Sequence, residues 1–196
     1  RLEALGGEWT IYTDGSADAG FKNGGSAAVV TKGGPSAPIT EHVIMKKGAA
    51  RTSSYEEEDQ AMRDAIAWVR ENGHPDQRIV IATDSQSLFS TLQNRSPEVD
   101  ELLNAIDECS ASITIQWIPG HSDIPGNELA DAHAKEAAQS TGAGRPVSYK
   151  SACAEVKRCF TDPPSTHQLT REVYSKYSEE KEKSVKNRSD QVLLAR

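Results

Sequence analysis

The chain has 196 residues, of which 36% are hydrophobic and 26% are charged, and its net charge at pH 7 is −7. The length fits one domain with an extension, or two small domains. An acidic chain is not expected to coat nucleic acid non-specifically, and no apolar stretch approaches the roughly 20 residues that a membrane-spanning helix needs.

The charge is unevenly distributed along the chain. Residues 1–140 contain 11 Lys and Arg against 22 Asp and Glu, a net charge of −11, whereas residues 141–196 contain 11 against 7, a net charge of +4. The three cysteines, Cys109, Cys153 and Cys159, have no metal-ligand spacing, and the start has no signal-peptide pattern. We therefore expect a protein of a reducing compartment, cytoplasmic or nuclear.

The first quarter of the chain is typical of an antiparallel meander. Strands are predicted over about residues 9–14, 26–31 and 40–46, where β-branched and apolar residues alternate with polar ones. The turn signals Asn23-Gly24-Gly25 and Lys32-Gly33-Gly34-Pro35 separate them.

Helices and strands then alternate. From Ser54 the apolar residues have helical spacing, with Ser53 or Ser54 as N-cap and Asn72-Gly73-His74-Pro75 as the end. A strand over 78–83, helices after Asp84 and over about 97–109, a strand over 112–118 and a helix over 127–138 follow. This order predicts an α/β fold, with a mixed sheet flanked by helices.

Residues 142–196 differ from the preceding residues in composition and pattern. Gly142 to Pro146 is predicted to be a linker, and helices are predicted over 149–160 and 169–183. We therefore expect one domain over residues 1–141 and a linker with a helical extension over residues 142–196. The chain stops within an apolar pattern at Val192 to Ala195, so we expect it to be a piece of a longer polypeptide.

Two aspartates follow predicted strands. Asp14 stands at the end of the strand over 9–14 and precedes Gly-Ser, and Asp84 follows the strand over 78–83 and precedes Ser-Gln. Alone, Asp14 is better interpreted as a turn residue, whereas a helix N-cap is an equally good interpretation of Asp84.

Two further carboxylates have matching contexts. In the triple Glu56-Glu57-Glu58, Glu58 lies at helical spacing from the apolar residues and should face the core, whereas Glu56 and Glu57 suit residues that complement the helix dipole. Asp131 lies one turn into the helix predicted over 127–138, where a surface position is the simpler interpretation. Together the four could converge on two hard divalent cations, which would offset their mutual repulsion.

Four segments in this order resemble type 1 ribonuclease H over about residues 8–140. They are Thr13-Asp14-Gly15-Ser16, Ser53-Ser54-Tyr55 with Glu58, Thr83-Asp84-Ser85-Gln86, and Gly120-His121 with Gly126-Asn127-Glu128-Leu129-Ala130-Asp131. The amino-acid sequences of the second and fourth segments resemble those of the ribonuclease H domains in polyproteins of non-LTR (LINE-type) retrotransposons.

The resemblance implies a ribonuclease H-like fold, with three antiparallel strands followed by two parallel ones. It implies an endonuclease that cuts the RNA strand of RNA–DNA hybrids during reverse transcription of a retroelement. A reverse transcriptase domain of the same polyprotein would be its partner, with no membrane and no small-molecule substrate.

The resemblance also implies roles for residues. Asp14 would bridge two Mg²⁺ ions, with Mn²⁺ as a substitute; Asp131 would hold one of them, and Glu58 and Asp84 the other. His121 would assist product release or proton transfer. The implied hybrid contacts, which distinguish RNA by its 2′-hydroxyl, are Gly15, Ser16, Ser53, Ser54, Gln86, Asn127 and Glu128.

One departure concerns affinity for the hybrid. The segment Gln93 to Glu98 is short and not basic, where the family often has a basic protrusion. Weak binding by the isolated domain is therefore expected, and tethering to a polymerase would supply effective concentration. The basic tail either adds backbone contacts or is a linker.

Two other functions fit the same residues. One is a catalytically degenerate spacer domain of a retroelement polyprotein, which the presence of all four carboxylates disfavours. The other is a nuclease of the same fold that acts on DNA, such as an integrase or resolvase, which the Ser-Ser, Asp-Ser-Gln and Pro-Gly-His segments disfavour.

Overall fold

The computed structural model describes residues 9–34 and 36–161, and the helix predicted over 169–183 lies outside them. Contacts divide the chain into a first compact unit that extends to Ser151 and a second that begins at Ala152. No helix among the described residues is both long and apolar enough to cross a membrane.

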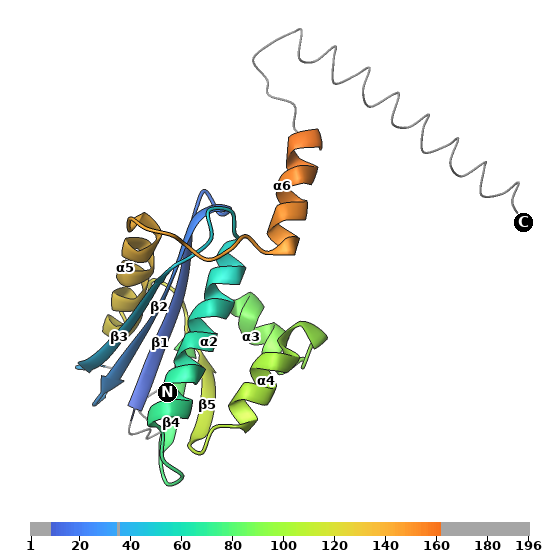
Figure 1. Ribbon diagram of the computed structural model, residues 1–196. Coiled ribbons are helices and arrows are strands. Elements are labelled where there is room, and N and C mark those ends of the chain that lie inside the picture. The colour runs from blue at the N-terminus through green and yellow to red at the C-terminus, as the bar shows by residue number, and fades with distance from the viewer. Residues whose placement is uncertain (1–8, 35, 162–196) are drawn as a thin grey trace, which may run out of the picture. The chain divides into compact units, whose positions relative to one another are not determined.

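Five strands form one mixed sheet in the order β3-β2-β1-β4-β5 (Figure 1). The strands are β1 (Trp9–Asp18), β2 (Lys22–Lys32), β3 (Ile39–Lys47), β4 (Arg78–Thr83) and β5 (Ser112–Trp117). β1, β2 and β3 pair antiparallel, whereas β4 pairs parallel with both β1 and β5. The predicted fold class is confirmed.

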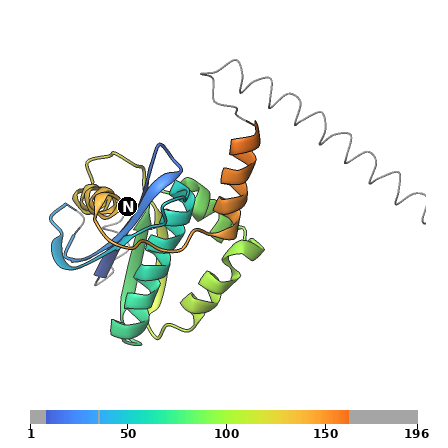
Figure 2. The same cartoon turned by 45° about the horizontal axis from the view of Figure 1, so that its top comes forward.

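Helices cover both faces of the sheet, as Figures 1 and 2 show. On one face lies α2 (Ser54–Asn72), which contacts α3 (Gln86–Gln93) and α4 (Asp100–Asp107). A short 3₁₀ helix, η1 (Pro97–Val99), precedes α4, so the single helix predicted over 97–109 is two elements. On the other face α5 (Pro125–Gln139) packs on β1, β2 and β3.

Strand alternation divides the core into two layers. Ile11 and Ile81 point toward α2, where they pack with Met62, Ile66 and other apolar residues. Their neighbours Tyr12 and Ala82 point to the opposite face, where Ala130 of α5 belongs to the same cluster. Both faces of β1 and β4 are therefore buried, which explains the nearly continuous apolar run of β4.

The first hairpin differs from the prediction. β1 continues past Asp14 to Asp18, and the turn lies at Ala19 and Gly20, which have positive φ angles of 51° and 78°. Gly24 and Gly25, predicted as a turn, are buried within β2. A side chain at Gly25 would collide with the backbone of α5 at Ala134 and Ala138, so close packing rather than a turn requires this glycine.

The segment after α5 has no regular secondary structure until α6 (Tyr149–Thr161) begins. Gly144 lies against the backbone carbonyl of Gly48, and the side chain of Arg145 is only 32% exposed. The compact unit therefore includes the residues that sequence analysis assigned to a linker, although the functional boundary at residue 141 stays a prediction.

Candidate active site

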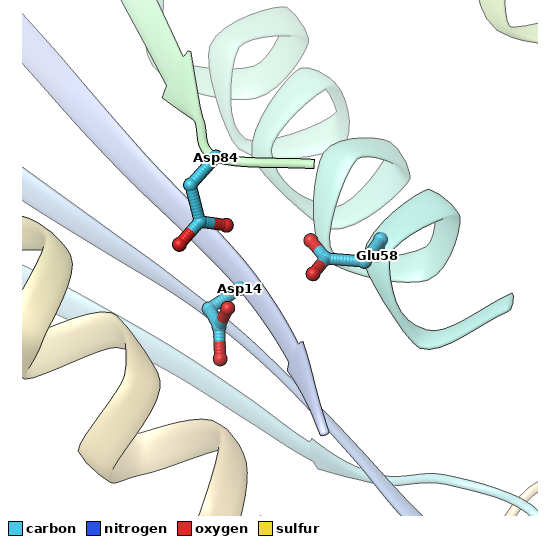
Figure 3. Close-up of side chains that lie close together, drawn as sticks. All are labelled: Asp14, Glu58 and Asp84. Carbon is cyan, nitrogen blue, oxygen red and sulfur yellow. The ribbon is translucent and has the colours of Figure 1, made fainter. Parts of the chain in front are cut away.

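The sheet register places two of the predicted carboxylates side by side. Thr13 and Thr83 form the last residue pair between the parallel strands β1 and β4. Asp14 and Asp84 are the next residues on their respective chains, so both project from the same point of the sheet (Figure 3). Asp14 is buried, at 7% exposure, and Asp84 is half-buried.

Glu58 joins them from the first turns of α2. A side chain at Gly15 would collide with the backbone at Glu57 and Glu58, so glycine allows α2 to approach β1 closely. Glu58 is 8% exposed, and its carboxylate faces the two aspartates (Figure 3). One oxygen from each of Asp14, Glu58 and Asp84 lies within 4.8 Å of the others.

The cluster is electrostatically strained. Burial raises the pKa of the Asp14 carboxyl to about 7, and the charges of Asp84 and Asp131 act in the same direction. Burial also raises the pKa of Glu58 well above its ordinary value, with added contributions from Asp14 and Asp84. Repulsion between these carboxylates therefore opposes ionisation of the whole set.

The residues fit a divalent cation. The Glu58 Oε2 atom is buried and has no hydrogen-bond partner among the described residues, which is costly for a carboxylate oxygen. Three convergent carboxylates offer the hard oxygen ligands that Mg²⁺ and Mn²⁺ take. A bound cation would partner the unpaired oxygen and remove the repulsion.

Asp131 lies outside the set of three. It sits on α5 with its side chain 24% exposed, and its Oδ2 accepts a hydrogen bond of 2.7 Å from Lys135 Nζ, one turn further along the helix. Its charge still raises the pKa of Asp14, so it lies near the cluster. Lys135 thus forms an ion pair with Asp131 in the structure, and the sequence analysis did not predict this pair.

Asp84 is held by two neighbours. Asn127 Nδ2 donates to Asp84 Oδ2 at 3.1 Å, and the Trp117 indole N–H donates to the Asp84 carbonyl at 3.2 Å. A side chain at Gly120 would approach Asp84 Oδ2 to 3.0 Å. Substrate binding by Asn127 stays a prediction; its contact in the structure is with the Asp84 carboxylate. Trp117 was not predicted, because strand alternation gave it no role beyond packing.

The remaining predicted site residues lie at the starts of helices, within β1 and in the loop before α5. Ser53 is the N-cap of α2 and forms a capping box with Glu56. Gly15 and Ser16 lie in β1 beyond Asp14. The exposed residues are Ser54 and Gln86, at the starts of α2 and α3; Glu128, in the first turn of α5; and His121, in the loop before α5 with a φ of 50°.

The expectation for Glu57 was wrong. Sequence analysis assigned it to the helix dipole, but its side chain is 0% exposed and lies 2.7 Å from Arg145 Nη2. Helical spacing alone did not reveal this, because Glu57 faces the glycines of β2 and of the segment after β3 rather than an apolar layer.

Sequence comparison places the chain among known proteins. The family model for RNase H matches residues 7–139. A ribonuclease H of Maricaulis maris (strain MCS10) is 28% identical over 144 residues, which are 65% of this chain and 91% of that protein. Ribonuclease H1 of Rattus norvegicus is 25% identical over 154 residues, which are 70% of this chain but only 52% of that protein.

Solved structures share the fold. LC11-RNase H1 in complex with an RNA/DNA hybrid has a TM-score of 0.52 and 19% identity, over 66% of this chain and 98% of that one. The foamy viral protease-reverse transcriptase in complex with an RNA/DNA hybrid has a TM-score of 0.55 and 17% identity, over 72% of this chain and 21% of that one. Since the family match spans well over half of its residues, the chain belongs to the RNase H family and is a ribonuclease H.

Proposed function

We propose that this chain hydrolyses the RNA strand of RNA–DNA hybrids and that Asp14, Glu58, Asp84 and Asp131 hold two Mg²⁺ ions for the reaction. The observation that carries the proposal is the convergence of three carboxylates around a buried, unpartnered Glu58 oxygen. When bound, two such ions supply an activated water and stabilise the leaving oxygen of the phosphodiester.

The residues of the site have different proposed roles. Asp14 interacts electrostatically with Asp84, Asp131 and Glu58, and it would help to hold both ions. Asn127 holds Asp84 in place. Asp131 would help to hold one of the ions, and the ammonium group of Lys135, which donates to Asp131 in the structure, would lie near the negatively charged substrate.

Hybrid recognition would involve the exposed residues around this cluster. Ser54, Gln86 and Glu128 stand at the starts of three helices, and backbone N–H groups at helix N-termini favour phosphate. The 2′-hydroxyl of the RNA strand would supply the discrimination. His121 is exposed on its loop and is placed to assist product release or proton transfer.

A retroelement is the proposed setting. The amino-acid sequences of the Ser53 and Gly120 segments resemble those of retrotransposon polyproteins. One structural neighbour is a viral protease-reverse transcriptase. A reverse transcriptase domain in the same polypeptide would compensate for the acidic surface by holding the hybrid nearby. The alternative, a degenerate spacer domain, does not account for a convergent carboxylate cluster with a buried oxygen that has no partner among the described residues.

The test uses the full chain with Mg²⁺ and three duplexes of one sequence, namely RNA–DNA, RNA–RNA and DNA–DNA. We expect cleavage of the hybrid alone. Asp14→Asn should lower the rate by about three orders of magnitude or more, which corresponds to about 4 kcal/mol of transition-state stabilisation. Asp76→Asn is the matched control, because Asp76 is exposed in the loop before β4. Equal rates for both variants would contradict the proposal.

A further inference from the structure

A segment beyond the matched family region is fastened to the helix that carries Glu58. We call residues 140–151 the strap. In Figure 1 it crosses from the end of α5 to the N-terminal end of α2. The family match ends at residue 139, so the strap lies beyond the matched region.

The central contact of the strap is a buried ion pair. Arg145 Nη2 lies 2.7 Å from Glu57 Oε1, and the Glu57 side chain is fully buried. The same Glu57 oxygen accepts a hydrogen bond of 2.7 Å from Thr52 Oγ1. A buried carboxylate without a cation nearby is strongly disfavoured, so Glu57 depends on Arg145 for its charge compensation.

The backbone around Glu57 is shaped to receive this pair. Gly24 of β2 and Gly48 after β3 both lie against the Glu57 carboxylate, where any side chain would collide with it. The Gly48 N–H donates to the Gly24 carbonyl at 2.7 Å, which joins the two glycines into one wall. Gly144 of the strap in turn lies against the Gly48 carbonyl.

Further contacts fasten the strap at both ends. Lys47 Nζ donates to the Ser140 carbonyl at its start. At its end, the hydroxyls of Ser148 and Ser151 donate to the carboxylate of Glu56, which also accepts from the Ser53 N–H in the capping box. The first turn of α2 is thus held at Glu56 and Glu57 by groups that the strap supplies.

We propose that Arg145 is a positioning residue: through its ion pair with Glu57, the strap fixes the first turns of α2 and, with them, the Glu58 carboxylate that faces Asp14 and Asp84. Glu58 follows Glu57 directly and lies against Gly15 of β1. A shift of this turn would therefore move Glu58 relative to the two aspartates. The inference rests on the proposed function only in that Glu58 binds metal.

The test compares Arg145→Ala with Arg70→Ala in the full chain. Arg70 is a matched control, because it also forms an ion pair from α2, at 3.6 Å to Glu108, but in the last turn. Two readouts are used: amide hydrogen exchange of residues 56–59, and the dissociation constant of Mn²⁺ from calorimetry.

We expect Arg145→Ala to raise the Mn²⁺ dissociation constant about tenfold, because a group that helps to orient a metal ligand is lost. Exchange of residues 56–59 should accelerate by about tenfold or more, because the turn opens locally. Arg145→Lys keeps a cation opposite Glu57 and should recover part of both effects. Arg70→Ala should match the wild type in both readouts.

A double variant covers the case in which Arg145→Ala does not fold. Glu57→Gln with Arg145→Met removes both buried charges, so no unpaired carboxylate remains, but it also removes the ionic link. It should show the same faster exchange and weaker Mn²⁺ binding. Wild-type exchange and affinity in the folded Arg145→Ala or double variant would overturn the proposal. If the wild type binds no Mn²⁺, the proposed metal function fails, whereas the exchange data still decide whether the strap fixes the turn.

Discussion

Asp14 and Asp84 occupy equivalent positions on neighbouring parallel strands, since each directly follows one member of the Thr13–Thr83 pair that ends the ladder. This register brings two acidic side chains together at one point of the sheet, and α2 adds Glu58, which points toward them from the side in Figure 3. The repulsion between these carboxylates destabilises the folded protein unless a cation compensates for it.

The pH dependence of stability should reveal this repulsion. The pKa of Asp14 is raised to about 7 in the folded protein, against about 3.9 for an unfolded chain. Between these values the folded state binds more protons than the unfolded state, so Asp14 makes folding less favourable as pH rises through this window.

We therefore expect Asp14→Asn to gain stability relative to the wild type as pH increases from about 5 to about 8 in the presence of EDTA. Thermal unfolding at several pH values measures this. Asp76→Asn should show no such trend, and a constant difference between Asp14→Asn and the wild type would contradict the assignment.

Divalent cations should stabilise the folded protein through the same cluster. At ten times the dissociation constant, a single bound ion adds about 1.4 kcal/mol to the free energy of unfolding. Thermal unfolding near pH 7.5 with Mg²⁺ or Mn²⁺, at constant ionic strength, should show a higher midpoint for the wild type. The shift should be smaller for Asp14→Asn, and equal shifts would locate the bound ion elsewhere.

Removal of the amide that holds Asp84 should slow catalysis without unfolding the protein. Asn127 is 2% exposed and donates to Asp84 Oδ2. Asn127→Ala is expected to lower kcat by about 10- to 100-fold, the usual effect of losing a group that orients a metal ligand. Asn72→Ala, which removes an exposed amide contact to the Trp68 carbonyl at the end of α2, is the control. Similar kcat values for both variants would show that Asn127 does not orient Asp84 for the reaction.

Gly15 should tolerate no side chain. A methyl group there would collide with the backbone of α2 at Glu57 and Glu58, which cannot move aside cheaply. Gly15→Ala is expected to lower the free energy of unfolding by about 1–3 kcal/mol or more. Gly34→Ala meets no atom within 4 Å and should change it little. Urea denaturation distinguishes the two, and equal stability would contradict the close approach of α2 to β1.

The sheet and most of its boundaries were predictable from the sequence. β4 begins and ends where the apolar run from Arg78 to Thr83 predicts, because burial on both faces leaves a clear signal. Helical spacing also separated Glu58 from Glu56. Asp14 and Asp84 were identified, but the reason was partly wrong for Asp14, since β1 does not end there.

The missed features depend on contacts between distant residues. Gly24 and Gly25 have the composition of a turn, and only their packing against Glu57 and α5 explains why they lie inside a strand. Glu57 pairs with Arg145, which is 88 residues away in a segment with no periodic pattern. The hydrogen bond between Lys135 and Asp131 has helical spacing, but the sequence pattern alone did not show that Lys135 pairs with a carboxylate proposed to bind metal.

The most direct test of the central claim is analysis of the products formed from a hybrid whose RNA strand is labelled. The full chain is incubated with the hybrid in Mg²⁺ and, separately, in EDTA. The account predicts RNA fragments with 5′-phosphate and 3′-hydroxyl ends, an intact DNA strand, and no cleavage in EDTA. An intact RNA strand after incubation of folded protein with Mg²⁺ or Mn²⁺, or cleavage that persists in EDTA, would contradict it.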